Sequence, residues 1–141
     1  MDTGTFSNLN WLHVLVAAIG YFALGALWYS ALFGKKWVQY QGIVINPQDP
    51  DAKKGMGAIM FGSFILMFIA TLGLAIIISR LQLTMVSSGI KWGLLTGICF
   101  SATAISISYL YVKKPLGLHV IDGLYHIIGQ VIAGIILCAW H

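Results

Sequence analysis

The sequence predicts an all-α, polytopic membrane protein: an antiparallel bundle of four transmembrane helices. Hydrophobic residues make up 59% of the 141 residues, and charged residues only 9%. A soluble domain carries about a quarter charged residues, so this chain needs the bilayer as its solvent. Four apolar runs each exceed the roughly 20 residues that cross the hydrocarbon. The runs are Trp11–Phe33, Gly57–Ser79, Gly89–Tyr111 and Leu116–Ala139, and we expect a single transmembrane domain over residues 1–141.

The first apolar run is expected to be a mature helix and not a cleaved signal peptide. Residues 1–10 contain no Lys or Arg, and the run is longer than a signal core and has no clear small-residue cleavage site after it. The segment Phe33–Tyr40 mixes Lys with aromatic residues, which favours a continuation of this helix into the headgroup layer. Asn46-Pro47 and Asp49-Pro50 should then end any helix.

The third predicted helix carries a ladder of small residues at four-residue spacing, which is typical of close helix packing in membranes. The second and third connections are short, which favours antiparallel neighbours. A contact with the second or fourth helix is favoured over a contact between two copies of the chain. The expected packing residues are Gly89, Gly93, Gly97 and Ser101, with Gly129 and Ala133 on the fourth helix.

The distribution of Lys and Arg predicts the orientation. The first and third connections lie on the same side of the membrane and hold Lys35, Lys36, Lys53, Lys54, Lys113 and Lys114. The other side holds only Arg80 and Lys91. We therefore expect a multi-pass protein of the bacterial cytoplasmic membrane with both termini outside. Aromatic belts are expected at the outer interface (Trp11, Trp92 and Trp140) and near the inner one (Trp28, Trp37, Tyr109 and Tyr111).

Asp122 is the only charged side chain in the interior of an apolar run, since Lys91 lies at the start of its run. A carboxylate at mid-bilayer costs roughly 2.5–3.5 kcal/mol on insertion scales, so Asp122 should be paired, neutral or functional. His119 and His126 lie three residues before and four residues after it, on the same helical face, and Gln130 extends that face. The expected cytoplasm-facing polar cluster comprises Asp122, His126, Tyr29, Tyr125, Ser108, His119, Gln130 and Ser30.

Three interpretations of this cluster remain open. It could only fix helix packing, as satisfied buried polar groups do. It could bind or conduct a small solute or a proton in a non-enzymatic, homo-oligomeric protein. It could also serve an intramembrane enzyme or a metal or cofactor site, although three ligands from one helix rarely converge on one ion. No catalytic motif is present, no particular cofactor or small-molecule ligand is indicated, and the net charge of +4 comes from loop lysines and predicts no nucleic-acid partner.

Several segments resemble the DUF1761 family of small bacterial and fungal membrane proteins. The matching text is LGALWYS at residues 24–30, FGKKW at 33–37 and DGLYH at 122–126, with further similarity at Asn10-Trp11 and 54–56. The family often has Pro where this chain has Ala31, and Asn in place of Asp122. The resemblance implies a compact four-helix membrane protein; the family is uncharacterised and adds no reaction or ligand.

The charge asymmetry yields a test of orientation. A cysteine introduced in the first connection (Gln48→Cys) should react only with reagents that enter the cytoplasm. Labelling of intact cells with an impermeant maleimide measures this, and rapid labelling at position 48 would reverse the topology.

Overall fold

The computed structural model describes residues 4–44, 46, 48, 50–51 and 55–140, and the described residues form helices without strands. Four helical stretches are long and apolar enough to cross a membrane, as the sequence predicts: Trp11–Leu32, Met56–Arg80, Val86–Tyr111 and Leu116–Ala139. In chain order the elements are α1 (Gly4–Ser7), α2 (Trp11–Leu27), η1 (Trp28–Leu32), α3 (Gly34–Gln41), α4 (Met56–Arg80), α5 (Val86–Thr96), η2 (Gly97–Ala102), α6 (Thr103–Tyr111) and α7 (Leu116–Ala139).

Local capping explains several helix ends. The Asn10 carboxamide oxygen accepts hydrogen bonds from the backbone N–H groups of Leu12 and His13, at 3.1 and 3.3 Å, and so starts α2. At the C-terminal end of the α2–η1–α3 stretch, Gly42 adopts a left-handed conformation (φ 71°) and ends α3. The continuation expected over Phe33–Tyr40 is present as a separate short helix, α3. The predicted helix breakers Pro47 and Asp49, and the loop lysines Lys53 and Lys54, lie outside the described residues.

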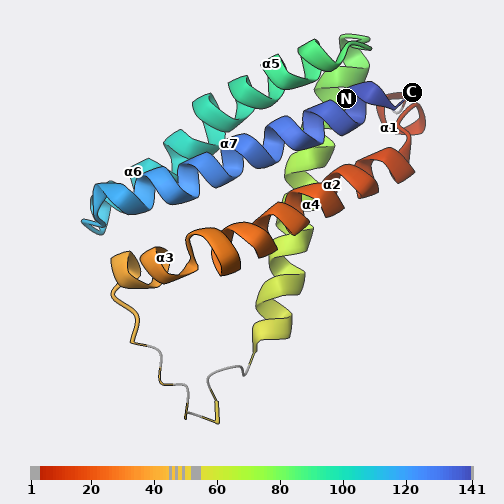
Figure 1. The fold of residues 1–141 in the computed structure, drawn as a ribbon. Coiled ribbons are helices and arrows are strands. Elements are labelled where there is room, and N and C mark those ends of the chain that lie inside the picture. Colours follow the sequence, from red (N-terminus) through yellow and green to blue (C-terminus); the bar gives the residue numbers. More distant parts are fainter. Residues whose placement is uncertain (1–3, 45, 47, 49, 52–54, 141) are drawn as a thin grey trace.

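Figure 1 shows α7 running between two neighbours. The α5–η2–α6 stretch lies along one side of α7, and the α2–η1–α3 stretch lies along the other, both antiparallel to it. Helix α4 crosses these helices steeply and packs mainly through its second half. Its buried residues are Thr71, Leu74, Ala75 and Ile78, whereas long apolar side chains of its first half, such as Phe61 and Leu66, are exposed.

The glycine ladder forms a close backbone contact between helices. Gly89 faces Gly134 backbone to backbone. A Cβ atom at Gly93 would lie 2.6 Å from the carbonyl oxygen of Gln130, and one at Gly97 would lie 2.6 Å from the Cα atom of Ile127. The ladder therefore packs α5 and η2 on α7 within one chain, one of the two arrangements that the sequence left open.

Two apolar clusters occupy opposite ends of the bundle. The cluster at the α1 end joins α2, α4 and α7 and includes Val14, Ala17 and the fully buried Ala133. The cluster at the α3 end is aromatic and centres on Tyr21, Trp28, Ile121 and Tyr125. The sequence placed Trp28 in an interfacial belt, but its indole N–H donates to the carbonyl oxygen of Ile121 (3.1 Å) and the residue is buried.

Because the glycine ladder is closely packed, a larger side chain within it should strongly lower the stability of the fold. Gly93→Leu should lower the free energy of unfolding in detergent by about 1–3 kcal/mol, because the added atoms meet backbone that cannot move aside. Gly73→Leu is the matched control, since a Cβ atom there meets nothing within 4 Å. Thermal unfolding of both variants measures the difference, and equal stability of Gly93→Leu and the parent would contradict this packing.

Candidate functional site

Three polar residues of α7 lie on successive turns and point into the protein. They are Asp122, His126 and Gln130; Asp122 is only 5% exposed and Gln130 only 6%, whereas His126 is partly buried. Four-residue spacing on a helix stacks side chains on one face. We call these residues the polar seam. Each of them reaches hydrogen-bonding partners on neighbouring elements, so the seam connects α7 to most of the fold.

The Asp122 carboxylate accepts hydrogen bonds from three neutral donors on three elements. The hydroxyl of Tyr29 (η1) donates to one carboxylate oxygen, and the hydroxyl of Tyr109 (α6) donates to the other. The indole N–H of Trp37 (α3) also donates to the second oxygen, at 3.4 Å. Within the described part of the chain, the carboxylate forms no ion pair with a Lys, Arg or His side chain. The carboxylate is therefore well solvated by hydrogen bonds but its charge is not neutralised.

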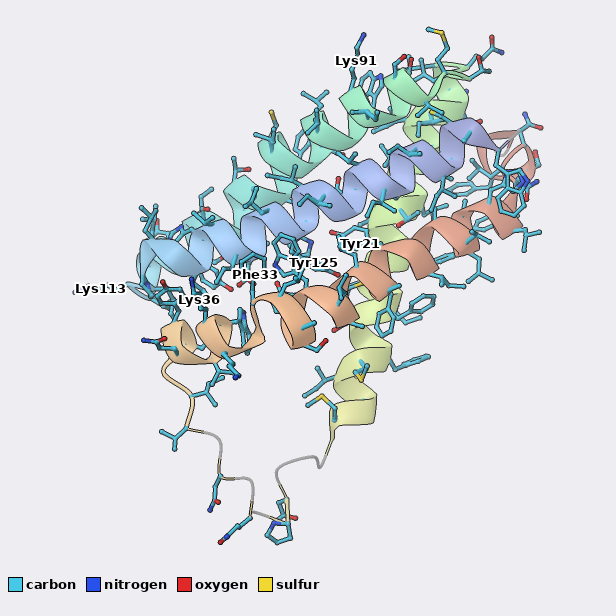
Figure 2. The ribbon with its side chains drawn as sticks, viewed as in Figure 1. Tyr21, Phe33, Lys36, Lys91, Lys113 and Tyr125 are labelled. Carbon is cyan, nitrogen blue, oxygen red and sulfur yellow. The ribbon has the colours of Figure 1, made fainter. Side chains whose placement is uncertain are left out.

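The second level of the seam is formed by His126 and two tyrosines. The Tyr21 hydroxyl and the imidazole Nδ1 of His126 share a hydrogen bond. The Tyr125 hydroxyl donates to the Tyr21 carbonyl oxygen at 3.4 Å, and the Tyr125 ring centroid lies 5.1 Å from that of Tyr29. Tyr125 thus links the His126 level to the Asp122 level. Figure 2 shows Tyr21 and Tyr125 in the space between α2 and α7.

Glycines make room for these rings. A Cβ atom at Gly25 would lie 2.8 Å from the Tyr125 hydroxyl oxygen, and one at Gly129 would lie 2.7 Å from the Tyr21 ring. Larger residues at either position would displace a tyrosine. Gly129 therefore packs α7 against α2, whereas Gly89, Gly93 and Gly97 pack it against α5 and η2.

Both π-helical segments lie opposite the seam. Segment η1 (Trp28–Leu32) carries Tyr29, which meets Asp122, and segment η2 (Gly97–Ala102) carries Ser101, whose hydroxyl accepts a hydrogen bond from the Gln130 carboxamide. A π turn holds an extra residue and so changes the direction of the side chains that follow. Such turns are frequent at functional sites, and here both serve the polar residues of α7.

Not every residue expected in the cluster is found there. Ser108 is exposed and donates to the Ala104 carbonyl oxygen (3.3 Å), and Ser30 is exposed and donates to the Ala26 carbonyl oxygen. Both placements correct the expectation, because each hydroxyl is satisfied by its own helix. His119 touches the cluster only through its ring contact with Tyr109, at 5.5 Å between centroids.

Sequence reasoning missed three members: Trp37, Tyr109 and Tyr21. Trp37 and Tyr109 were assigned to the inner aromatic belt, and their shared partner Asp122 was not recognised. A useful signal was that a buried carboxylate needs hydrogen-bond donors at its own depth, and Tyr and Trp side chains near the same ends of the helices can supply them.

The surroundings of the cluster restrict its chemistry. Among the described residues, no group of three or more His, Cys, Asp or Glu side chains is placed to hold a metal ion. An open hollow of about 410 Å³ adjoins the cluster and is lined by Tyr29, Ser30, Gly34, Lys35 and Val38. Tyr29 lines this hollow, whereas Asp122 and His126 do not.

Four apolar spans and a paired polar interior define an α-helical membrane protein of unknown function. The chain belongs to the DUF1761 family: the family's profile, described as a protein of unknown function, matches residues 12–138. The resemblance seen in the sequence is thereby confirmed. No curated protein and no solved structure matches the chain.

The hydrogen bonds of Asp122 predict which substitutions the protein tolerates at this position. Asp122→Leu should destabilise the fold by about 1–3 kcal/mol, because it leaves partly buried hydroxyl and indole donors unpaired. Asp122→Asn should be close to neutral, since the carboxamide keeps an acceptor oxygen. Thermal unfolding in detergent compares the two variants, and equal stability of the Leu and Asn variants would show that these hydrogen bonds contribute nothing.

Proposed function

We propose that this protein is a non-enzymatic component of the bacterial cytoplasmic membrane that takes up and releases a proton at Asp122. The observation that carries the proposal is a buried carboxylate with three neutral donors and, among the described residues, no cation partner. An unneutralised carboxylate in a low-dielectric environment is costly, and binding a proton removes that cost. Residues of this kind within membrane spans commonly belong to proton or ion pathways.

The packing favours a proton over a larger solute. A solute needs a cavity, and the hollow beside the cluster is not lined by Asp122 or His126. A proton needs only hydrogen-bonding groups that can exchange it. Tyr29 touches both the hollow and Asp122, so its hydroxyl is the proposed link between the aqueous side and the carboxylate.

His126 is the proposed second proton-binding group. It lies one turn beyond Asp122 and shares a hydrogen bond with Tyr21, and an imidazole ring can both accept and donate a proton. Tyr125, in contact with both Tyr21 and Tyr29, lies between the two levels. Gln130 and Ser101 continue the seam as hydrogen-bonding groups that do not titrate.

The orientation and assembly are part of the same proposal. The bias of Lys and Arg supports a cytoplasmic location of the α3 end and both termini outside. Lys36 and Lys113 lie at that end (Figure 2), and Asp122 contacts Trp37 of α3. A homo-oligomer would use the exposed first half of α4, since the glycine ladder is already occupied by α7.

A structural role is the second candidate. Both carboxylate oxygens of Asp122 are already engaged by donors from η1, α3 and α6, which is what a permanent connection between helices requires. In that role Asp122 would never change its protonation state, and this difference separates the two candidates.

Infrared difference spectroscopy decides between them. The chain contains only four Asp and Glu side chains, so the C=O stretch of a protonated carboxyl group is readily assigned. Between alkaline and acidic pH, the parent protein in lipid should gain a band that Asp122→Asn removes. Asp51→Asn, which changes an exposed loop carboxyl group, should keep that band. A spectrum of Asp122→Asn identical to that of the parent would refute proton uptake at Asp122 and leave the structural role.

A further inference from the structure

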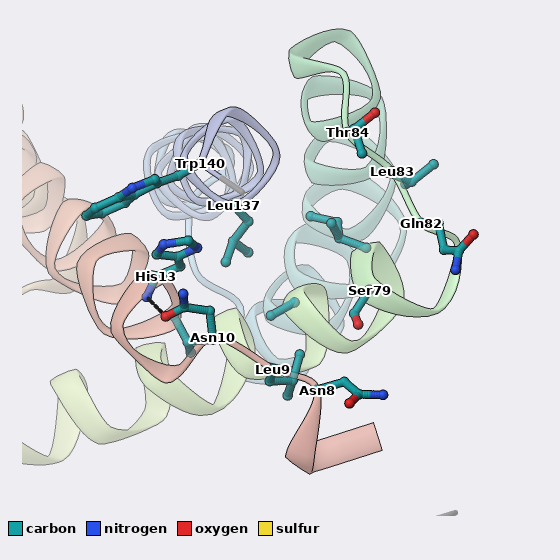
Figure 3. Close-up of a pocket in the computed structure, with 13 residues that line it drawn as sticks. Asn8, Leu9, Asn10, His13, Ser79, Gln82, Leu83, Thr84, Leu137 and Trp140 are labelled. Atoms are coloured by element: carbon teal, nitrogen blue, oxygen red, sulfur yellow. Dashed lines mark hydrogen bonds between the residues drawn. The ribbon is translucent and has the colours of Figure 1, made fainter. Parts of the chain in front are cut away.

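A second cavity lies at the α1 end, far from the polar seam. Its volume is about 290 Å³. Figure 3 shows that it lies among the start of α2, the end of α4 with the loop that follows, and the end of α7. Pockets for small molecules in proteins have volumes upward of about 300 Å³, so this one suits a single ring or a short chain.

The floor of the cavity is apolar and rigid. Leu9, Val14, Ala75, Ile78 and Leu137 line it, and all five belong to the buried cluster at this end of the bundle. An apolar floor with a few polar groups around it is the usual composition of a small-molecule site. A fully polar ligand would lose its hydration here without compensation.

The rim of the cavity is polar. Asn10, His13, Ser79 and Gln82 contribute polar side chains, and none of the described residues that line the cavity is Asp, Glu, Lys or Arg. The nearby Arg80 guanidinium instead donates to the Thr5 hydroxyl and ties α1 to α4. Among the described residues that line the cavity, a charged ligand would find no counter-charge, which favours a neutral ligand.

Hydrogen-bond donors line the rim where the start of α2 meets the end of α7. The Asn10 carboxamide oxygen is used to cap α2, which leaves its NH₂ group to donate. The imidazole of His13 and the indole N–H of Trp140 add further donors. The two rings also stack, with centroids 4.4 Å apart and an angle of 18°, and give this wall a flat aromatic surface (Figure 3).

We infer that this cavity binds the ring of a neutral amphiphile that carries carbonyl oxygens, such as a membrane quinone. The apolar floor accepts the ring, the donors on the α2 side bind the carbonyl oxygens, and the position at the helix ends lets an apolar tail extend into lipid. The proposal concerns binding only and does not depend on proton uptake at Asp122.

The test uses a benzoquinone with one isoprenoid unit as the probe and the full chain in lipid nanodiscs. The parent protein should bind the probe saturably, above the partitioning measured in protein-free nanodiscs. Ser79→Phe fills the cavity and should weaken binding by more than about tenfold, whereas His13→Phe keeps the stacking, removes a donor and should weaken it by about three- to tenfold. Gly73→Phe and Leu12→Phe introduce the same side chain on exposed parts of the same helices and should bind as the parent does.

A photoreactive azido-benzoquinone gives a second readout on the parent protein, which does not depend on any variant folding. Cross-links mapped by mass spectrometry should fall within residues 8–14, 75–84 or 137–140. Partitioning equal to that of empty nanodiscs, unchanged binding by both cavity variants, or cross-links concentrated around Asp122 would each overturn the inference.

Discussion

Within a bilayer, a polar side chain must find its partner inside the protein, and this constraint organises the fold around α7. Asp122, His126 and Gln130 face inward on successive turns, and their partners come from α2, η1, α3, η2 and α6. Because those partners belong to different elements, satisfying the three residues fixes the positions of nearly all neighbours of α7 at once. Helix α4 makes little use of these interactions and is also the helix that diverges most from the others.

Close packing and polar pairing depend on each other in this protein. The contact between Gly93 and the backbone of α7 sets both the distance and the rotation of the α5–η2–α6 stretch. That rotation places Ser101 against Gln130 and Tyr109 against Asp122. A bulky residue in the ladder would therefore disturb hydrogen bonds several turns away. The ladder is both a packing device and the element that aligns donors with the carboxylate.

The sequence was sufficient to predict the four spans, the ladder and an inward-facing Asp122 near Tyr29, because hydropathy, small-residue spacing and the cost of buried charge each leave a direct signal. It was not sufficient to predict which side chain of the third span meets Asp122. A regular helix places Ser108 on the face of Ser101, but the η2 segment interrupts that regularity. One residue turns a helix by about 100°, so the neighbouring Tyr109 takes the position expected for Ser108. The steep course of α4 and the cavity at the α1 end arise from tertiary packing and left no such signal.

The long sequence separations within the Asp122 cluster have a consequence for biosynthesis. Tyr29 and Trp37 precede Asp122 by 93 and 85 residues, so a ribosome completes α2 and α3 well before their shared acceptor exists. During that interval the hydroxyl and indole donors depend on water, lipid headgroups or the insertion machinery. The glycines of α5 likewise lack their packing partner until α7 has been synthesised. Insertion of α7 is therefore the step at which a set of loosely associated spans becomes an ordered protein, and nascent chains stalled before it are the species most exposed to membrane quality control.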